Sequence, residues 1–318
     1  MATNLVRFDM GGAARWGVVK GSDIASLGGD YPTTADLIER GEPDWLAARD
    51  KPASLPLDSL KILSPVTAPC RIYCQGANYR QHMIESGMNP DAKVFNMFFT
   101  KSDASLASAR GVVMRPKHVG LLDYEIELAL VFRRAIDKPV TVTREQLKDY
   151  VFAIAIGNDL SARDVQLPQT QFFKGKSYRG FCPLGPWLTV LEPDEFDLID
   201  NLELELAVNG VTRQRDCTRN LVFKPAETIS ELSTFANVAP GDVLLTGTPS
   251  GCALRLPPPA IRRFVQLLPD RQFWALFFRS QSRRPQYLKP GDRIGARIFS
   301  ADRRIDLGEQ RIEVLTEG

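Results

Sequence analysis

Two strand-like runs decide the fold of this 318-residue chain, and they read Asp123-Tyr-Glu-Ile-Glu-Leu-Ala-Leu-Val-Phe132 and Val151-Phe-Ala-Ile-Ala-Ile-Gly-Asn-Asp159. Successive side chains of a strand point to opposite faces, so Glu125 and Glu127 share one face of the first run and the isoleucine and leucines share the other. The second run is apolar until it ends in an acid, which is typical of a buried strand. We therefore expect a domain that is mainly β.

Shorter runs of the same kind extend this picture along the chain. They are bounded by turn residues and cover residues 187–190, 202–208, 243–246 and 293–299. Asn209-Gly210 can supply the positive φ angles of a type I′ turn, which predicts a hairpin after residue 208. Helices are expected to be few and short, among them one capped by Asn78 and ending near Gly87. The expected fold class is α+β, mainly β.

The first 65 residues have a different character from the rest. Short apolar runs alternate there with Gly-rich turns, and residues 34–40 show a helical pattern. A Pro-rich stretch from Lys51 to Pro69 then breaks the periodicity. We predict a small N-terminal α/β domain over residues 1–65 and a catalytic domain over residues 66–318.

Composition narrows the function classes. The 40 Lys and Arg against 38 Asp and Glu leave a formal charge of +2, which provides no overall field for binding nucleic acid. No apolar run reaches the roughly 18 residues of a membrane span, and residues 1–19 lack the apolar core of a secretory signal. The five cysteines are odd in number and have no C-x-x-C spacing, so we expect reduced thiols in the cytoplasm.

Three carboxylates are candidates for a metal site. Glu125 and Glu127 lie beside an apolar wall, where paired negative charges are costly unless a cation neutralises them, and Asp159 ends the neighbouring run. Oxygen ligands without nearby His or Cys favour Mg²⁺, Mn²⁺ or Ca²⁺. The alternative is a solvated strand face, as expected for Glu203 and Glu205, which have the same spacing beside a hairpin. Asp159 has its own alternative as the cap of a turn.

The candidate base is one of only two histidines in the chain. On a helix, the spacing of His82 and Glu85 places both on one face, close enough for the carboxylate to orient the imidazole. Such a pair is half of a general-base dyad. It is also an ordinary feature of exposed helices.

Substrate-binding candidates follow the second run. Several polar and cationic side chains there could bind an anionic substrate: Arg163, Gln166, Lys176 and Arg179. Thr248 stands in a small-residue loop whose glycines allow close approach, although such a loop is also a plain strand exit. The chain has Thr170 where a P-loop around Lys176 would need its first glycine, and it has no G-x-S-x-G motif, so nucleotide binding and a serine nucleophile are not expected.

Six ordered motifs together resemble the fumarylacetoacetate hydrolase family. They are N-Y-x-x-H-x-x-E, D-Y-E-x-E-L-A, G-N-D-x-S-A-R-D-x-Q, G-K-S, P-L-G-P-W and G-D-V-L-L-T-G-T-P-S-G, which span about residues 65–251, with a further match near Gly291-Asp292. The resemblance implies a mixed β-roll catalytic domain, usually in a homodimer. It also implies a small N-terminal domain before it, as many members carry.

The resemblance also implies roles for individual residues. Mg²⁺ or Mn²⁺ would be held by carboxylates that match Glu125, Glu127 and Asp159. His82 and Glu85 match a dyad on a mobile lid that activates water, and Lys176 matches a lysine near the reacting oxygen of the substrate. We expect the substrate to be contacted by the following residues: Tyr79, Arg163, Gln166, Arg179 and Thr248.

The activity expected from this resemblance is hydrolysis of a C–C bond in an acylpyruvate-like β-diketo acid from a catabolic pathway such as aromatic degradation. His82 and Glu85 would activate water, and the metal with Lys176 would stabilise the departing enolate. One alternative is a decarboxylase or isomerase of a related oxo-acid on the same scaffold. Another, from a different class, is a binding protein that keeps the metal site without turnover.

Two departures from the family pattern bear on the substrate. Arg179 stands where many members have an acid after G-K-S-F. An insert over about residues 252–289 separates Gly251 from the last turn, and it carries eight basic residues, one acidic residue and interleaved aromatic ones. We expect this insert to form a pocket wall or a subunit contact rather than a nucleic-acid patch.

Overall fold

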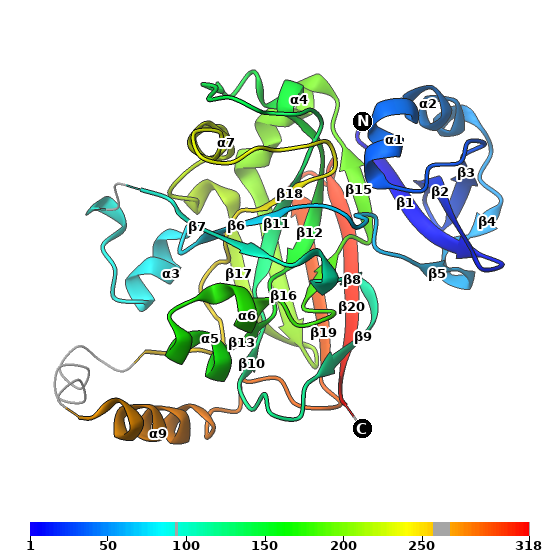
Figure 1. Ribbon diagram of the computed structural model, residues 1–318. Helices are drawn as coiled ribbons and strands as arrows, with labels where there is room; N and C mark the ends of the chain where they lie inside the picture. The colour runs from blue at the N-terminus through cyan, green and yellow to red at the C-terminus, as the bar shows by residue number, and fades with distance from the viewer. Residues whose placement is uncertain (93–94, 257–267, 318) are drawn as a thin grey trace.

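The computed structural model describes residues 1–92, 95–256 and 268–317, which form two large β-sheets with short helices around them (Figure 1). The larger sheet has thirteen strands, of which β5 (Lys61–Ile62), β8 (Leu106–Ser108) and β14 (Cys182–Leu184) lie off its main path. Its main path runs in the order β4 (Leu55–Pro56), β3 (Asp23–Ser26), β2 (Ala13–Lys20), β1 (Thr3–Met10), β15 (Trp187–Val190), β12 (Val151–Asn158), β11 (Ile126–Phe132), β18 (Val243–Leu245), β6 (Ile72–Gly76) and β7 (Met97–Lys101).

The second sheet has five strands, and a two-stranded ribbon accompanies it. The five follow the order β17 (Val211–Cys217), β16 (Leu202–Val208), β19 (Arg293–Ser300), β20 (Asp306–Thr316) and β9 (Arg110–Arg115), and the ribbon pairs β10 (Leu122–Asp123) with β13 (Ser161–Ala162). Most pairs are antiparallel, but three are parallel: β18 with β6, β14 with β8, and β20 with β9. The mixed sheets confirm the α+β, mainly β class.

The helices are short, and several of them pack against the sheets through buried side chains. Their bounds are α1 (Thr34–Arg40), α2 (Glu42–Asp50), α3 (Arg80–Glu85), α4 (Leu147–Tyr150), α5 (Arg163–Gln169), α6 (Phe172–Lys176), α7 (Pro225–Leu232) and α9 (Asp270–Gln281). The longest of them, α9, belongs to the insert and projects from the lower end of the molecule in Figure 1.

Most strands agree with the sequence analysis, and the first deciding run differs in one respect. It is not one strand but two, because β10 ends at Asp123 and β11 begins at Ile126. Between them the backbone amides are bound by side chains rather than by a neighbouring strand: Tyr124 donates to the carboxylate of Asp123, and Glu125 donates to the side chain of Asn158. The break therefore falls at the candidate site.

Two local predictions have different outcomes. Asn209 and Gly210 both have positive φ angles, 52° and 77°, and join β16 to β17 as the predicted hairpin. The predicted cap of α3 is wrong, because the helix begins at Arg80 and the Asn78 side chain bonds elsewhere. That side chain donates to the carbonyls of Phe223 and Thr246 and accepts from the Phe223 amide, which joins the start of α3 to the end of β18.

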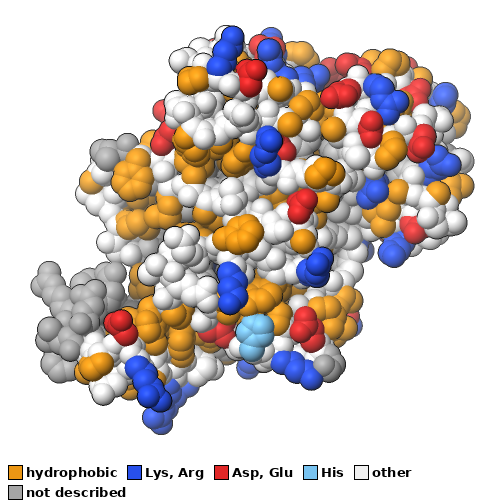
Figure 2. Space-filling view, viewed as in Figure 1, with side chains coloured by type: hydrophobic (Ala, Val, Ile, Leu, Met, Phe, Trp, Pro, Cys, Tyr) orange, Lys and Arg blue, Asp and Glu red, His pale blue; other side chains and the backbone are white. Residues whose placement is uncertain are grey.

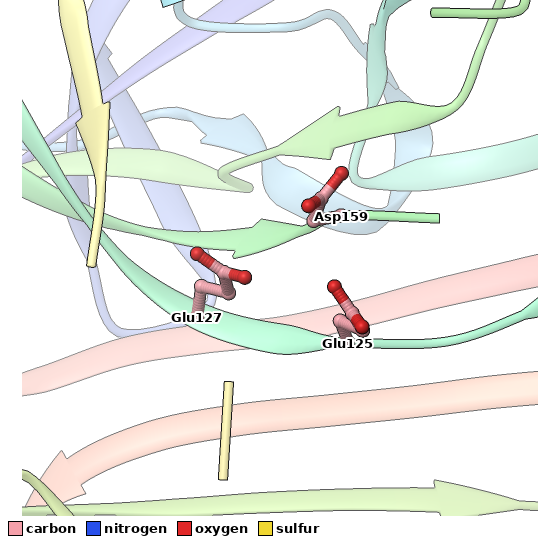
Figure 3. Close-up of side chains that lie close together, drawn as sticks. All are labelled: Glu125, Glu127 and Asp159. Carbon is pink, nitrogen blue, oxygen red and sulfur yellow. The ribbon is translucent and has the colours of Figure 1, made fainter. Parts of the chain in front are cut away.

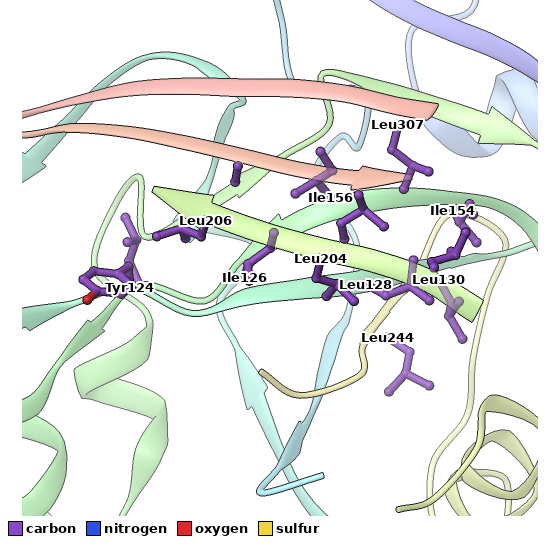
Figure 4. Packing of buried hydrophobic residues seen from close by; sticks show 14 of the residues in the cluster. Tyr124, Ile126, Leu128, Leu130, Ile154, Ile156, Leu204, Leu206, Leu244 and Leu307 are labelled. Atoms are coloured by element: carbon purple, nitrogen blue, oxygen red, sulfur yellow. The ribbon is translucent and has the colours of Figure 1, made fainter. Parts of the chain in front are cut away.

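The core lies between the two sheets. Ile126, Leu128 and Leu130 on one face of β11 belong to the same buried cluster as Leu204 and Leu206 of β16 (Figure 4). On the opposite face of β11, Ala129 and Val131 pack in a second cluster, which includes residues of the N-terminal segment. The alternation predicted for the first run is thus confirmed, and it places Glu125 and Glu127 away from the inter-sheet core.

The N-terminal segment is joined to the larger sheet through β1. This strand pairs with β15 over Thr3 to Val6, so one sheet continues from the N-terminal segment into the strands that carry the candidate site. Leu5, Trp16 and Leu37 pack in the second cluster together with the far face of β11. The proposed division near residue 65 therefore separates two units that share a sheet and part of a core.

The distribution of surface charge and the character of the helices relate to binding of nucleic acid and membranes. On the face drawn in Figure 2, Lys and Arg side chains lie scattered among acidic and apolar ones. Within residues 1–92, 95–256 and 268–317, no helix combines the length and apolar character needed to cross a membrane.

Replacing Leu204 with alanine should lower the free energy of unfolding by about 2–5 kcal/mol, because the fully buried side chain would leave a cavity between the sheets. Urea unfolding followed by fluorescence measures the loss. Glu205→Ala on the half-buried face of the same strand serves as the control, with an expected change below about 1 kcal/mol. Equal losses in both variants would contradict this assignment of the core.

Candidate metal centre and adjoining cavities

The three predicted carboxylates lie together at the ends of β11 and β12. The two strands are antiparallel, with Glu127 opposite Gly157, and the amide of Asp159 donates to the carbonyl of Glu125 at 2.8 Å. One oxygen from each of Glu125, Glu127 and Asp159 lies within 4.8 Å of the others, and all three side chains are buried. In Figure 3, Glu127 of β11 and Glu125, which directly precedes this strand, extend from the same side of the chain toward Asp159.

Buried cations surround these carboxylates. The ammonium of Lys176 lies 2.5 Å from oxygens of both Glu125 and Asp159, and the ammonium of Lys101 lies 2.5 Å from the other oxygen of Asp159. Arg163 forms ion pairs with Glu125 and with a fourth buried carboxylate, Asp123. The cluster therefore contains four buried carboxylates and three buried cations.

Glu127 is the carboxylate without a cation among the described residues. One of its oxygens accepts a hydrogen bond of 2.7 Å from the amide of Gly247. Burial, together with the charges of Asp159 and Glu125, raises the pKa of Glu127 well above its ordinary value. For Glu125, burial also opposes ionisation, but Arg163 and Lys176 outweigh it and lower the pKa.

This charge distribution fits a divalent cation. Three buried oxygen donors converge, and the negative charge left over is concentrated on Glu127, where it is costly without a counter-charge. The donor set contains oxygen only, which suits a hard ion such as Mg²⁺ or Mn²⁺. Glu125, Glu127 and Asp159 are thus the residues that would hold it.

The loop after β18 is shaped to reach this cluster. Gly247 has a φ of +87°, and a Cβ atom there would lie 2.9 Å from the Cβ of Asn78, so only glycine fits this close approach. Thr248, predicted to offer its hydroxyl to the substrate, lines the site, but the hydroxyl is already engaged. It donates to the carbonyl of Ile126 and accepts from the side-chain amide of Gln214.

Two short helices bring the polar side chains of residues 163–176 to the same place. Gly175 in α6 lies so close to α5 that a Cβ atom would approach Gln166 to 2.7 Å. Gln166 accepts a hydrogen bond of 2.8 Å from Arg163, and both residues border the carboxylate cluster with Lys176. Although burial favours the neutral amine, Asp159 and Glu125 raise the pKa of Lys176, so the side chain stays charged.

His82 lies at this site, but among the described residues no hydrogen bond or salt bridge joins it to its predicted partner, Glu85. The half-buried imidazole borders the cluster, and burial lowers its pKa, so the ring is neutral at pH 7. Glu85 is exposed and accepts a hydrogen bond from Gln81, and within the described residues no hydrogen bond joins it to His82. Orientation of the ring by Glu85 therefore stays a prediction that this arrangement does not display.

Two other predicted substrate contacts lie elsewhere. Tyr79 is fully buried in the inter-sheet core, and its hydroxyl has no hydrogen-bond partner among the described residues. Arg179 is exposed, and neither residue lines the cavities at the cluster. The structure thus gives no support to substrate contacts from these two side chains.

Sequence reasoning missed two charged residues of the cluster. Lys101 ends an apolar strand, and a lone buried lysine at such a place was the available signal. Asp123 stands in the first deciding run, but its partners come from distant segments. It accepts from Arg163 and from the amides of Ala253 and Leu254, and so ties the start of the insert to the site.

Two cavities open beside the cluster. The smaller, of about 160 Å³, is lined by Glu125, Glu127 and Lys176 together with apolar side chains such as Phe99. The larger, of about 490 Å³, continues toward the insert and the hairpin. His82 and Arg163 are among the residues that border both cavities.

The fold and the site define a class of proteins in which mixed sheets carry a buried carboxylate cluster suited to a divalent cation, with a histidine beside it. The model of the fumarylacetoacetate (FAA) hydrolase C-terminal region matches residues 71–315, so the chain belongs to the fumarylacetoacetate hydrolase family. The resemblance found in the sequence is thereby confirmed.

Similar proteins have been assigned different reactions. Oxaloacetate tautomerase YisK of Bacillus subtilis (strain 168) is 36% identical over 213 residues, which cover 65% of this chain and 68% of that protein. The structure of a probable 2-hydroxyhepta-2,4-diene-1,7-dioate isomerase from Mycobacterium abscessus is 30% identical, with a TM-score of 0.73 over 100% of both chains. Maleylpyruvate hydrolase from Sphingobium sp. SYK-6, in complex with manganese (II) ion and pyruvate, is 27% identical, with a TM-score of 0.73 over 99% of this chain and 100% of that chain.

Glu127→Gln should weaken Mn²⁺ binding by at least about 100-fold, since even partners outside the ligand shell contribute roughly 10–100-fold to metal affinity. Isothermal titration calorimetry of the metal-free protein measures this. The thermal midpoint without metal should not fall, because burial already disfavours the ionised form of Glu127 and glutamine is neutral. Glu205→Gln is the matched control. Glu205 and Glu203 have the same spacing as Glu127 and Glu125, but they lie on a half-buried strand face. Wild-type affinity in Glu127→Gln would contradict the assignment.

Proposed function

We propose that this protein is a divalent-metal-dependent enzyme that moves a proton on a 2-oxo acid, as a keto–enol tautomerase or a double-bond isomerase. The observation that carries the proposal is the neutral His82 beside the carboxylate cluster, with no hydrogen bond to Glu85 among the described residues. Proton transfer needs one well-placed base, whereas hydrolysis also needs an activated water. The names of two of the similar proteins support the same choice.

The chemistry assigns a clear part to His82. An imidazole nitrogen takes a proton from the carbon next to the oxo group, the C–H electron pair becomes a C=C bond, and the oxo oxygen takes up the negative charge. The proton then returns to oxygen in a tautomerase, or to a carbon farther along the conjugated chain in an isomerase. A divalent cation held by the carboxylates would supply an electrophile that polarises the oxo group.

The small cavity also needs groups that stabilise the negative charge and orient the substrate. These are Lys176, Arg163 and Gln166. Lys176 keeps its positive charge and can stabilise the negative charge that develops on oxygen. Arg163 and Gln166 offer donors that orient a carboxylate. Apolar side chains, including Phe99 and Phe172, border the same cavity and limit the access of water to the charged intermediate.

Hydrolysis of a C–C bond in an acylpyruvate-like β-diketo acid is the second candidate. The observation in its favour is the similarity to maleylpyruvate hydrolase over nearly the whole of both chains. It requires Glu85 to approach His82, so that the pair can activate water. Decarboxylation of an oxo-acid would use the same enolate and is distinguished by release of CO₂.

The cysteine thiols support a cytoplasmic location for the protein. All five cysteines are free, and a reducing cytoplasm would keep them so. A homodimer is the family-based expectation for this enzyme, which size-exclusion chromatography with light scattering would test.

His82→Ala should lower kcat for tautomerisation by roughly 10²–10⁴-fold, the usual contribution of a general base. Decay of enol absorbance, with oxaloacetate as the first substrate and Mg²⁺ or Mn²⁺ against EDTA, measures the rate. His118→Ala is the matched control, because this exposed second histidine contacts Tyr178 and lines neither cavity. Appearance of pyruvate from an acylpyruvate, with no tautomerase activity, would replace the proposal with the hydrolase.

The pH dependence follows from burial of His82. Because its pKa lies below the ordinary histidine value of about 6.5, kcat/KM should stay level above pH 7 and fall only on the acidic side, as the imidazole becomes protonated. A pH series of initial rates measures this acidic limb. The limb should vanish from the residual activity of His82→Ala, and its persistence there would assign the titration to another group.

A further inference from the structure

A third cavity, of about 320 Å³, lies where the N-terminal segment meets the rest of the chain. Arg133 in its wall directly follows β11, and Asp149 belongs to α4, which leads into β12. The cavity is therefore at the ends of these strands opposite to the carboxylate cluster, and its lining shares no residue with the two cavities there. Cavities that bind small molecules commonly measure about 300–1,000 Å³, so this one is large enough for a ligand.

Two buried donors in the wall of this cavity lack an acceptor. Trp45 of α2 is only 6% exposed, and its indole N–H has no hydrogen-bond partner among the described residues. The Nε–H of Arg133 is buried and equally without a partner there, while the guanidinium carbon lies 5.4 Å from the ring centre of Phe152. A buried donor that forms no hydrogen bond costs free energy, so two in one wall indicate an acceptor from outside the chain.

The charged side chains of the wall are of both signs. They are two bases and three acids: Arg133, Lys148, Glu42, Asp149 and Glu192. Glu192 is paired with Arg49 at 2.9 Å, and the other two acids and the two bases form no salt bridge within the described residues. Charges of both signs around one cavity complement a ligand that itself carries both signs. A guanidinium also presents paired donors that match the geometry of a carboxylate.

Apolar side chains form most of the remaining lining, and the frame around them is fixed. They are Trp45, Val190, Leu191, Pro193 and Phe196, all buried except the proline. Val190 of β15 pairs with Thr3 of β1, and the Arg49–Glu192 ion pair joins α2 to the segment after β15. A wall of this kind favours a ligand with an apolar body beside its charged groups.

We infer that this third cavity binds an α-amino acid with an apolar side chain. The carboxylate accepts from Arg133 and Trp45, the ammonium faces Glu42 and Asp149, and the side chain packs against the apolar wall. The occupant is a ligand other than the substrate, because none of the proposed catalytic groups lines this cavity. The inference therefore goes beyond the proposed function and does not depend on it.

Isothermal titration calorimetry with amino acids and their singly charged analogues tests the inference without turnover. The probes are L-leucine and L-phenylalanine. 4-Methylpentanoate is leucine without the ammonium, 3-methylbutylamine is leucine without the carboxylate, and glycine lacks the apolar side chain. We expect leucine to bind at least about 10-fold more tightly than any of these three, the usual effect of losing one hydrogen bond to a charged group or a buried apolar side chain.

The variants assign the binding to this cavity. Arg133→Gln should remove most of the preference of leucine over 3-methylbutylamine, because the carboxylate loses its cation. Trp45→Phe removes the N–H and should weaken leucine binding about 5-fold, the usual effect of one neutral hydrogen bond. Arg134→Gln is the matched control, because Arg134 is the next residue, is exposed and lies outside the lining. Thermal midpoints of all variants establish that each is folded.

The outcomes separate this cavity from the catalytic one, which could attract an amino acid because it resembles a 2-oxo acid. Binding of leucine that is retained in His82→Ala and lost in Arg133→Gln would support the inference, whether or not tautomerase activity is present. Binding that is lost in His82→Ala but survives in Arg133→Gln would place the ligand at the carboxylate cluster and overturn the inference. Failure of both amino acids to bind, or equal affinity for leucine and its analogues, would overturn it as well.

Discussion

Burial of four carboxylates where β11 and β12 end is the constraint on which the rest of the structure depends. Such a cluster is unstable in a protein interior unless cations and hydrogen-bond donors surround it. The chain meets this need with Lys101 from β7, Lys176 from α6 and the Gly247 amide from the loop after β18. Each comes from a different segment. The negative charge of the carboxylates is therefore compensated only when the sheets, the two short helices and the loop have all reached their folded positions. The excess charge that remains on Glu127 is what a divalent cation would balance.

The sequence predicts the strands well and the site less completely, for a physical reason. Alternation along β11 is a local property, and it correctly separates the core face from the face of Glu125 and Glu127. Burial is not local: Glu203 and Glu205 have the same spacing, yet they lie on a half-buried strand face. What distinguishes the two pairs is the arrival of Arg163 and Lys176 at Glu125 from far along the chain, and no spacing within the run reports that.

The same reason explains the residues that were misplaced. Asn78 is a residue type that often caps helices, but its side chain instead forms hydrogen bonds with Phe223 and Thr246 and so joins three segments. Nothing in the sequence indicates a partner for the Thr248 hydroxyl, yet in the fold it forms hydrogen bonds with Ile126 and Gln214. Polar side chains near a crowded site are taken up by the scaffold that positions the site, and only the folded arrangement shows which remain available to a ligand.

Arg163 borders both cavities at the carboxylate cluster and connects that cluster to the insert. Its guanidinium pairs with Glu125 of the carboxylate cluster and with Asp123, which in turn holds the start of the insert. The smaller cavity is therefore bordered by residues of β11, α5 and α6, while the larger one is bordered by the hairpin strand β17 and by both ends of the insert. Because the proposed proton transfer uses only groups of the smaller cavity, a change in the lining of the larger one would leave that chemistry in place.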